Sequence, residues 1–166
     1  LYGDEGGNNL ELDLHPANNP SAPATDHGAL HGYWDNDAAG TALGLMAKQF
    51  RTAHPSHAHA ASNDELAAEY AMLQPAAWNL AALPPRDWAQ AMADDVLPLA
   101  QAAHRRLQFH DITIVNKHGR NEAEGDAVEQ AAADGMSYRD WAGKVTLDEI
   151  HKGGWRLAAL LVRIVP

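Results

Sequence analysis

The sequence predicts a mainly α-helical fold with one short β-strand near the N-terminus. Several segments place apolar residues at alternating three- and four-residue steps, which is the spacing of an amphipathic helix. Two Ser/Thr-x-x-Glu motifs, beginning at Ser62 and Thr146, have the pattern of a capping box that starts a helix. With 166 residues, 46% of them hydrophobic, the chain can bury one core, and a single domain over residues 1–166 is expected.

The first residues predict a glycine-rich loop followed by a strand. Gly6 and Gly7 permit positive φ and let another segment approach closely, although an ordinary turn explains them equally well. Leu10 to Leu14 alternates leucine with acidic residues, the two-residue period of a strand with one buried face. Residues 15–25 are rich in proline and asparagine and predict an irregular loop.

The rest of the chain is predicted to be largely helical. Helices are expected over residues 27–37, 38–52, 62–73, 84–110 and 146–164, the first of them capped by Thr25 or Asp26. Between the last two helices, a β-branched stretch ends in a basic turn at residues 117–120. The acidic, alanine-rich segment 122–134 predicts a short helix or an insertion.

A regular apolar stripe runs along the last predicted helix. Its members recur at steps of three and four residues and are predicted to be buried: Leu147, Ile150, Gly154, Leu157, Leu161 and Ile164. Two consecutive glycines inside a helix, Gly153 and Gly154, cost about 1 kcal/mol each relative to alanine. Their presence predicts that another backbone packs closely against this helix.

His31 and Asp35 form the candidate metal site. Four residues apart on a helix, their side chains project from one face with Cβ atoms ~5–6 Å apart. An imidazole nitrogen and a carboxylate oxygen at this spacing can both reach one zinc ion at ~2.0–2.2 Å. The alternative is an ordinary helical ion pair.

Two other groups have both a functional and a structural interpretation. His54, His57 and His59 can hold a transition metal, but the proline among them breaks helical geometry and a solvated loop is favoured. Asp94 and Asp95 resemble a carboxylate pair, yet adjacent helical residues point in different directions, so solvated side chains are expected.

Two motifs support the metal interpretation. Gly3-Asp4-Glu5-Gly6-Gly7-Asn8, followed by Leu30-His31-Gly32-Tyr33-Trp34-Asp35, resembles the zinc-dependent single-strand-specific nucleases of fungi and plants, the S-one/P-one nuclease family. The segment Gly153 to Leu161 is similar to the last helix of that family. The resemblance implies a helical bundle, shared with zinc phospholipase C, that has a short β-hairpin near the N-terminus of this chain.

The resemblance also implies a function. It is the hydrolysis of phosphodiester bonds in single-stranded DNA or RNA, as an endonuclease or 3′-nucleotidase, by a hydroxide that a cluster of three zinc ions activates. His31 and Asp35 match two ligands of one zinc, and no further catalytic residue is predicted. Asp4, Gly6, Gly7 and Asn8 are expected to support the loop or the metal ligands without binding zinc themselves.

The family's other zinc ligands have no counterpart in this sequence. The chain therefore matches the C-terminal portion of the family's domain, is expected to be incomplete on its N-terminal side, and should be inactive alone. Its expected partners are a single-stranded nucleic acid or nucleotide substrate and the missing N-terminal segment. Two alternatives remain: a phospholipase C-like lipid hydrolase, and a non-catalytic helical module that needs a partner chain.

Composition limits the remaining possibilities. The chain has no cysteine, so histidine and carboxylates are the candidate ligands. A net charge of −10 disfavours broad attraction to phosphate backbones, so a nucleic acid would have to be bound locally. No apolar run is long enough for a membrane span, and secretion or a periplasmic location follows only from the resemblance.

Overall fold

The computed structural model describes residues 7–14, 26–75, 80 and 83–165. These residues form two compact units. The first contains the described residues up to Thr41 and those from Ala100 to Gly143, and the second contains the residues between and after them. The structure is about 59% helical and about 20% strand, with four strands in one mixed sheet. The prediction of a mainly α fold with a short hairpin is therefore wrong, because the sheet makes this an α/β structure.

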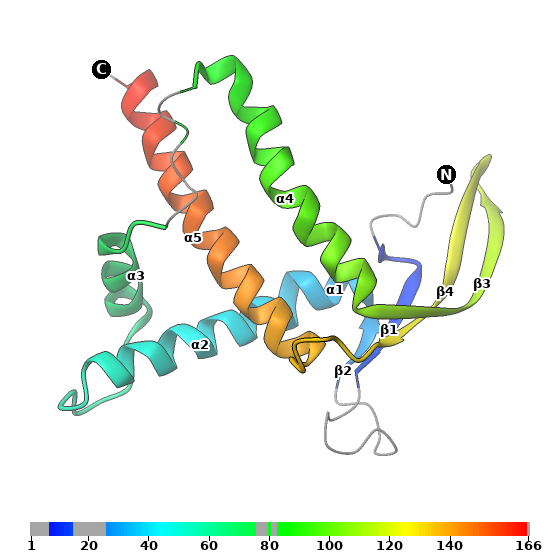
Figure 1. Cartoon of the computed structure of the whole chain (residues 1–166), viewed down its shortest axis with the longest axis horizontal. Helices are drawn as coiled ribbons and strands as arrows, with labels where there is room; N and C mark the ends of the chain where they lie inside the picture. The colour runs from blue at the N-terminus through cyan, green and yellow to red at the C-terminus, as the bar shows by residue number, and fades with distance from the viewer. Residues whose placement is uncertain (1–6, 15–25, 76–79, 81–82, 166) are drawn as a thin grey trace. The chain divides into compact units, whose positions relative to one another are not determined.

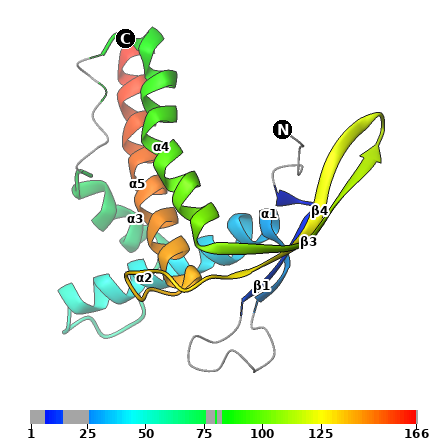
Figure 2. The ribbon, with the colours of Figure 1, turned by 45° about the vertical axis from the view of Figure 1, so that its right-hand side comes forward.

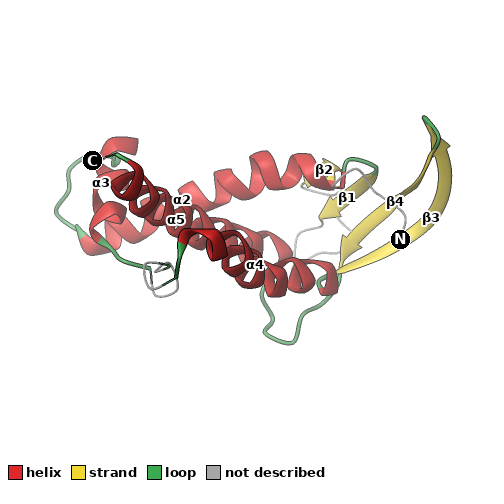
Figure 3. Ribbon diagram, turned by 90° about the horizontal axis from the view of Figure 1, so that it is seen from above, coloured by secondary structure: helices red, strands yellow, loops and turns green. Residues whose placement is uncertain are grey.

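The sheet of the first unit has the strand order β2-β1-β4-β3 (Figures 1 and 3). The strands are β1 (Leu10–Leu14), β2 (Asp26–Ala29), β3 (Leu107–Lys117) and β4 (Arg120–Glu129). β1 pairs antiparallel with β2, which is the hairpin that the resemblance implies, and parallel with β4 on its other side. The leucines of β1 are buried while Glu11 is exposed, so the predicted alternation is confirmed.

β4 overturns the prediction of a helix or insertion over residues 122–134. The basic turn before it is built for a hairpin: His118 and Gly119 have φ values of 52° and 79°, and a two-residue hairpin turn of type I′ needs positive φ at both central positions. This turn directs the chain back along β3, and Ala127 of β4 becomes fully buried. Figure 2 shows the resulting ribbon of β3 and β4 in yellow and green.

A register shift interrupts the β3–β4 ladder between His110 and Thr113. Asp111 has a φ of 51° at this irregularity. Opposite it, a Cβ added to Gly125 would lie 2.7 Å from the carbonyl oxygen of His110. Glycine at position 125 is therefore required by close backbone approach.

The predicted helix over residues 27–37 begins later than expected. Residues 26–29 form β2, and the helical segment starts with α1 (Leu30–Gly32) and the π-helical turn η2 (Tyr33–Asp37), leading into α2 (Ala38–Ala53). Asp26 lies in β2, and the N-cap position of the helical segment is occupied by Ala29, so the predicted cap position is wrong. Thr25, the other predicted cap, lies outside the described residues.

The second unit is helical. It contains most of α2, α3 (Asn63–Met72), the short 3-10 turn η3 (Pro85–Asp87), and the larger parts of α4 (Trp88–Arg105) and α5 (Tyr138–Ile164). The capping box at Ser62 is confirmed: the Ser62 hydroxyl accepts from the Glu65 amide at 3.2 Å, and the Glu65 carboxylate accepts from the Ser62 amide at 2.8 Å. Among the helices that the structure describes, none is long and apolar enough to cross a membrane.

The second capping-box prediction is wrong. α5 starts at Tyr138, well before Thr146, and the Ser137 hydroxyl accepts a hydrogen bond from the Asp140 amide at 3.0 Å. Thr146 therefore lies inside a continuous helix. Ser137 is the N-terminal cap instead, because its hydroxyl accepts from an amide of the first turn that has no acceptor within the helix.

The predicted burial of the α5 stripe is also wrong. Leu147 is buried, but the stripe residues after it are exposed, and no neighbouring atom lies within 4 Å of a Cβ added to Gly153 or Gly154. In the second unit, α5 instead turns a polar face to α4, which runs beside it in Figures 1 and 2. Asp95 of α4 accepts from Lys152 at 2.8 Å and from Arg156 at 2.7 Å, and both cations are buried.

Candidate metal site

His31 and Asp35 face each other on the surface of the first unit. The Nε2 atom of His31 lies 3.1 Å from Oδ2 of Asp35, and the two side chains are 45% and 64% exposed. His31 belongs to α1 and Asp35 to η2, where the Ala38 amide donates to the Tyr33 carbonyl, five residues back. The predicted convergence of the two side chains is confirmed, although the backbone between them is wider than an α-helix.

The two aromatic residues between them anchor this turn in the core. Tyr33 is buried and packs at 5.7 Å, centroid to centroid, from Tyr138, so the packing interpretation holds for it. Trp34 donates its indole N–H to the Tyr138 hydroxyl at 3.1 Å and packs edge-on against Trp141 at 6.0 Å. Burial raises the pKa of Tyr138 to about 12, so this hydroxyl stays neutral and able to accept.

Gly7 packs closely against the start of the same helical segment. Its φ is +94°, a value that favours glycine, and a Cβ at this position would lie 3.2 Å from the His31 amide nitrogen. The expectation of positive φ and a close approach at Gly7 is confirmed, while its support of a metal site stays a prediction. Asn8, the next residue, is exposed, and Asp4 and Gly6 lie outside the described residues.

The donor pair fits part of a zinc site. Two ligand atoms on a tetrahedral zinc with bonds of ~2.1 Å are about 3.4 Å apart, close to the 3.1 Å observed here. A metal would need at least one more protein ligand, and no group of three histidine, cysteine or carboxylate side chains comes together within the described residues. The chain therefore presents two donors to a cation, and both donors point to solvent.

A small polar cavity lies on another side of the same helical segment. It has a volume of about 210 Å³ and is lined by Leu12, Gly28, Ala29, Gly32, Tyr33, Asn36 and Asp37. His31 and Asp35 are not among these residues, so the donor pair does not open into the cavity. Asn36 donates to the Gly32 carbonyl at 3.0 Å, which holds its amide within the helical segment.

The histidine-rich loop of the second unit, residues 54–59, is held to α3 by two of its imidazoles. His57 lies 3.1 Å from a carboxylate oxygen of Glu65, and His54 lies 3.3 Å from one of Glu69. The two glutamates are one turn apart on α3, so the imidazoles hold the loop to that helix. His59 contributes its carbonyl, which lies 2.8 Å from Nδ1 of His57. The loop interpretation is therefore better supported than a three-histidine metal site.

Several polar residues with a structural role were missed by the sequence analysis. Asp95 is the acceptor between two buried cations, and the expectation of a solvated side chain is wrong for it. A partial signal was available, since Lys152 and Arg156 recur at a four-residue step and so share one face of the helix. His151, one position earlier, donates to the carbonyls of Tyr70 and Leu73 at the end of α3.

No protein-family model matches the chain, and comparisons with curated proteins and with solved structures find no match. The resemblance to the zinc nucleases therefore rests on the motifs themselves.

Proposed function

We propose that this chain contributes one zinc-binding edge of a phosphodiesterase that cleaves single-stranded DNA or RNA. The proposal is carried by one observation, the convergence of the His31 imidazole and the Asp35 carboxylate at 3.1 Å on an exposed surface. The packing of Gly7 against the His31 amide supports it, because the two motifs of the resemblance meet at that point. A secreted or periplasmic location belongs to the same proposal.

The chain's own residues would position the cation and leave room for substrate. His31 would donate a lone pair from Nε2 to the metal, and Asp35 would add a negative charge that offsets the charge of the metal. Zinc at this place would polarise a phosphodiester and activate water for its hydrolysis. Trp34 and Tyr33 hold the turn from the core side, so both donors keep their orientation when a substrate arrives.

A further polypeptide segment is needed to complete the site. Structural zinc sites have four protein ligands and catalytic sites usually three, so a pair binds zinc weakly. The proposal therefore includes a segment that supplies the remaining ligands, either from the same gene product or from a partner chain. The net charge of −10 means that this assembled metal cluster, and not the surface charge, would hold the nucleic acid.

Zinc binding tests the donor pair directly. The purified chain is expected to bind zinc with low affinity in equilibrium dialysis, and His31→Ala should remove most of this binding. His57→Ala is the matched control, because it also removes an imidazole paired with a carboxylate. Equal losses in the two variants would count against the assignment of His31.

Reconstitution tests the reaction. The N-terminal segment of a zinc nuclease would be added to the chain, and zinc content would be measured with cleavage of single-stranded RNA, single-stranded DNA and a phospholipid. Nucleic-acid cleavage that depends on both components and on His31 supports the proposal. Hydrolysis of the phospholipid alone would favour a lipid hydrolase, and full activity of the chain without the added segment would refute the shared site.

A further inference from the structure

The apolar stripe of α5 faces outward in the second unit. Ile150, Leu157, Leu161 and Ile164 are 62%, 56%, 46% and 62% exposed. The opposite side of the helix packs on α4 through buried cations, with Lys152 and Arg156 both bound to Asp95. Burying charge while exposing leucine is the reverse of the usual pattern for a surface helix. An exposed stripe of this regularity marks an interaction surface.

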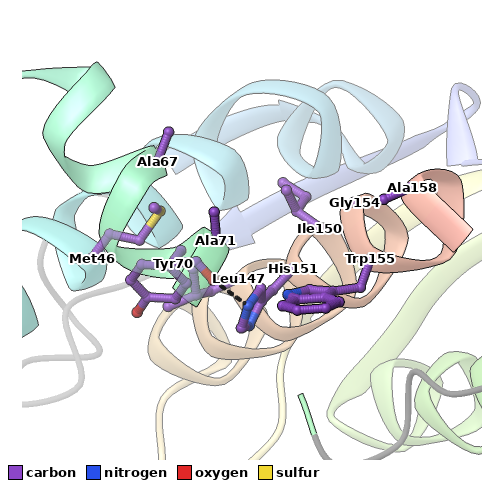
Figure 4. A pocket seen from close by; sticks show the side chains of 10 residues that line it. All are labelled: Met46, Ala67, Tyr70, Ala71, Leu147, Ile150, His151, Gly154, Trp155 and Ala158. Carbon is purple, nitrogen blue, oxygen red and sulfur yellow. Dashed lines mark hydrogen bonds between the residues drawn. The ribbon is translucent and has the colours of Figure 1, made fainter. Parts of the chain in front are cut away.

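The first half of the stripe lines a cavity. Leu147, Ile150 and Gly154 form one wall of a space of about 470 Å³ (Figure 4). The other residues around it come from α2, α3 and the neighbouring positions of α5: Met46, Ala67, Tyr70, Ala71, His151, Trp155 and Ala158.

The polar groups at this cavity are engaged within the chain. His151 Nε2 lies 2.8 Å from the Tyr70 carbonyl, and the Trp155 indole N–H donates to the Leu73 carbonyl at 2.9 Å. The Tyr70 hydroxyl donates to Gln49. The cavity therefore offers a hydrocarbon surface, and its fitting occupant is a set of aliphatic side chains.

The second half of the stripe supplies such side chains. Leu157, Leu161 and Ile164 project from the same helix beyond the cavity. We propose that two copies of this chain associate through antiparallel α5 helices, so that the projecting half of each stripe enters the cavity of the other copy. The two contacts are then identical and related by a twofold axis, as in most homodimers.

The spacing of the stripe gives the register. Steps of three and four residues form the heptad pattern of a two-helix seam, with Leu147, Gly154 and Leu161 in one class of position and Ile150, Leu157 and Ile164 in the other. Antiparallel pairing sets each class against the other. Leu157 of the second copy then lies against Gly154, where the structure leaves open space, and Leu161 of the second copy lies against Ile150.

Charge also favours a second copy in this orientation. The residues that flank the seam, among them Gly153, Ala158 and Leu160, are uncharged, so the net charge of −10 is not concentrated at the interface. The charged residues Lys152 and Arg156 lie on the other side of α5, toward α4, and Arg163 packs over the Trp88 ring of α4, so none of them is buried in the seam. Antiparallel pairing also opposes the two helix dipoles favourably.

Sedimentation equilibrium tests the association. The wild-type chain should be a dimer at micromolar concentration, and Leu161→Glu should weaken dimerisation by at least about 30-fold because it buries a charge against Ile150 of the other copy. Val162→Glu is the matched control, since Val162 is the next residue, is 80% exposed and lies off the stripe. A monomeric wild-type chain, or equal effects of the two variants, would overturn the proposal.

Disulfide cross-linking tests the register, because the chain has no cysteine of its own. The double variant Ile150→Cys/Leu161→Cys should form covalent dimers on oxidation. Either single variant should not, since identical positions lie about 16 Å apart along antiparallel helices in this register. Cross-linking of the single variants at the rate of the double variant would indicate parallel helices and overturn the proposal. None of these substitutions touches His31 or Asp35, so the outcome is independent of the proposed zinc function.

Discussion

At the scale of single residues, the pairing of His57 with Glu65 makes the stability of the start of α3 depend on pH. A hydrogen bond to the His59 carbonyl and the contact with Glu65 raise the pKa of His57 above 6.5. The backbone and hydroxyl of Ser62, together with His57, lower the pKa of Glu65 from 4.5 to about 2. The raised pKa of His57 adds stability that is fully present below pH 6.5 and is lost as pH rises through the folded-state pKa. The lowered pKa of Glu65 adds stability that is fully present above pH 4.5 and is lost as pH falls toward about 2.

The His57→Ala variant is therefore expected to lose more stability at about pH 5.5 than at about pH 8.5, because only the charged imidazole has its full interaction with Glu65. Chemical denaturation at the two pH values measures the difference. His59→Ala is the control, since His59 acts through its carbonyl and the substitution keeps it. A loss of equal size at both pH values would contradict the charged pairing.

Asp95 is expected to contribute more to stability than its exposed neighbour Asp94, because it accepts from two buried cations. Burial alone would raise its pKa, but the hydrogen bonds from Lys152 and Arg156 outweigh burial and hold the pKa below 3.8. Asp95→Ala leaves both buried cations without this acceptor and should reduce the free energy of unfolding by about 2 kcal/mol, a value that allows for the partial exposure of the carboxylate.

Asp94→Ala provides the comparison for that measurement. The Asp94 carboxylate accepts from Gln90 at 2.7 Å on the surface of the same helix, and its loss should cost less than about 0.5 kcal/mol. Thermal or urea unfolding of the two variants gives the two free energies. Similar values would show that the contacts of Asp95 with Lys152 and Arg156 stabilise the chain no more than a surface contact does.

At the scale of elements, the β3–β4 hairpin depends on one glycine. Gly125→Ala would bring a methyl group to within 2.7 Å of the His110 carbonyl oxygen, and the backbone must move to accommodate it. We expect a loss of about 1–3 kcal/mol in the free energy of unfolding, the cost of forcing a carbon atom into a filled space.

Gly40→Ala is the matched control for this substitution. Gly40 lies inside α2 with no neighbouring atom within 4 Å of an added Cβ, so alanine should stabilise the chain by about 0.5–1 kcal/mol through helix propensity. Opposite signs for the two alanines, measured by denaturant unfolding, are the expected result. A stabilising Gly125→Ala would show that the register shift in the hairpin is not tightly packed.

The sequence predicted correctly those elements that form from local patterns of neighbouring residues. The alternation of Leu10 to Leu14 and the capping box at Ser62 are both confirmed. β4 was missed because its residues, from Arg120 to Glu129, have low β propensity and become a strand through pairing on both sides. The start of α5 carried a usable signal, since Ser137 and Asp140 have cap spacing, but the stronger motif at Thr146 obscured it.

In the candidate site, too, only the local geometry could be predicted from the sequence. The facing of His31 and Asp35 follows from their four-residue step, and the contact of Gly7 follows from its freedom at positive φ. The exposure of the α5 stripe did not follow, because a periodic pattern shows which residues share a face and not what covers that face. The placement of Asp95 opposite Lys152 revealed which side of the helix is turned inward.

At the scale of the whole molecule, the net charge of the chain predicts that its binding of nucleic acid depends on metal. With a net charge of −10, it should show no saturable binding to a labelled single-stranded oligonucleotide without metal. Zinc, added together with the N-terminal segment of a zinc nuclease, should create binding that His31→Ala removes. Arg120→Gln, in the basic turn, is the control and should leave this binding unchanged. Fluorescence anisotropy measures both, and strong binding without zinc would contradict the metal-dependent proposal.

The parallel pairing of β1 with β4 has a consequence for how the chain acquires its structure. Leu10 pairs with Gly125, so α2, α3 and α4 all lie between these two neighbouring strands in the sequence. During synthesis, β1 must wait for most of the polypeptide to emerge, whereas the β3–β4 ribbon closes locally as soon as its turn appears. Contacts between such distant segments fold slowly, so completion of the sheet should be the late step of folding, and the unpaired edge of β1 the segment most exposed to misassembly until then.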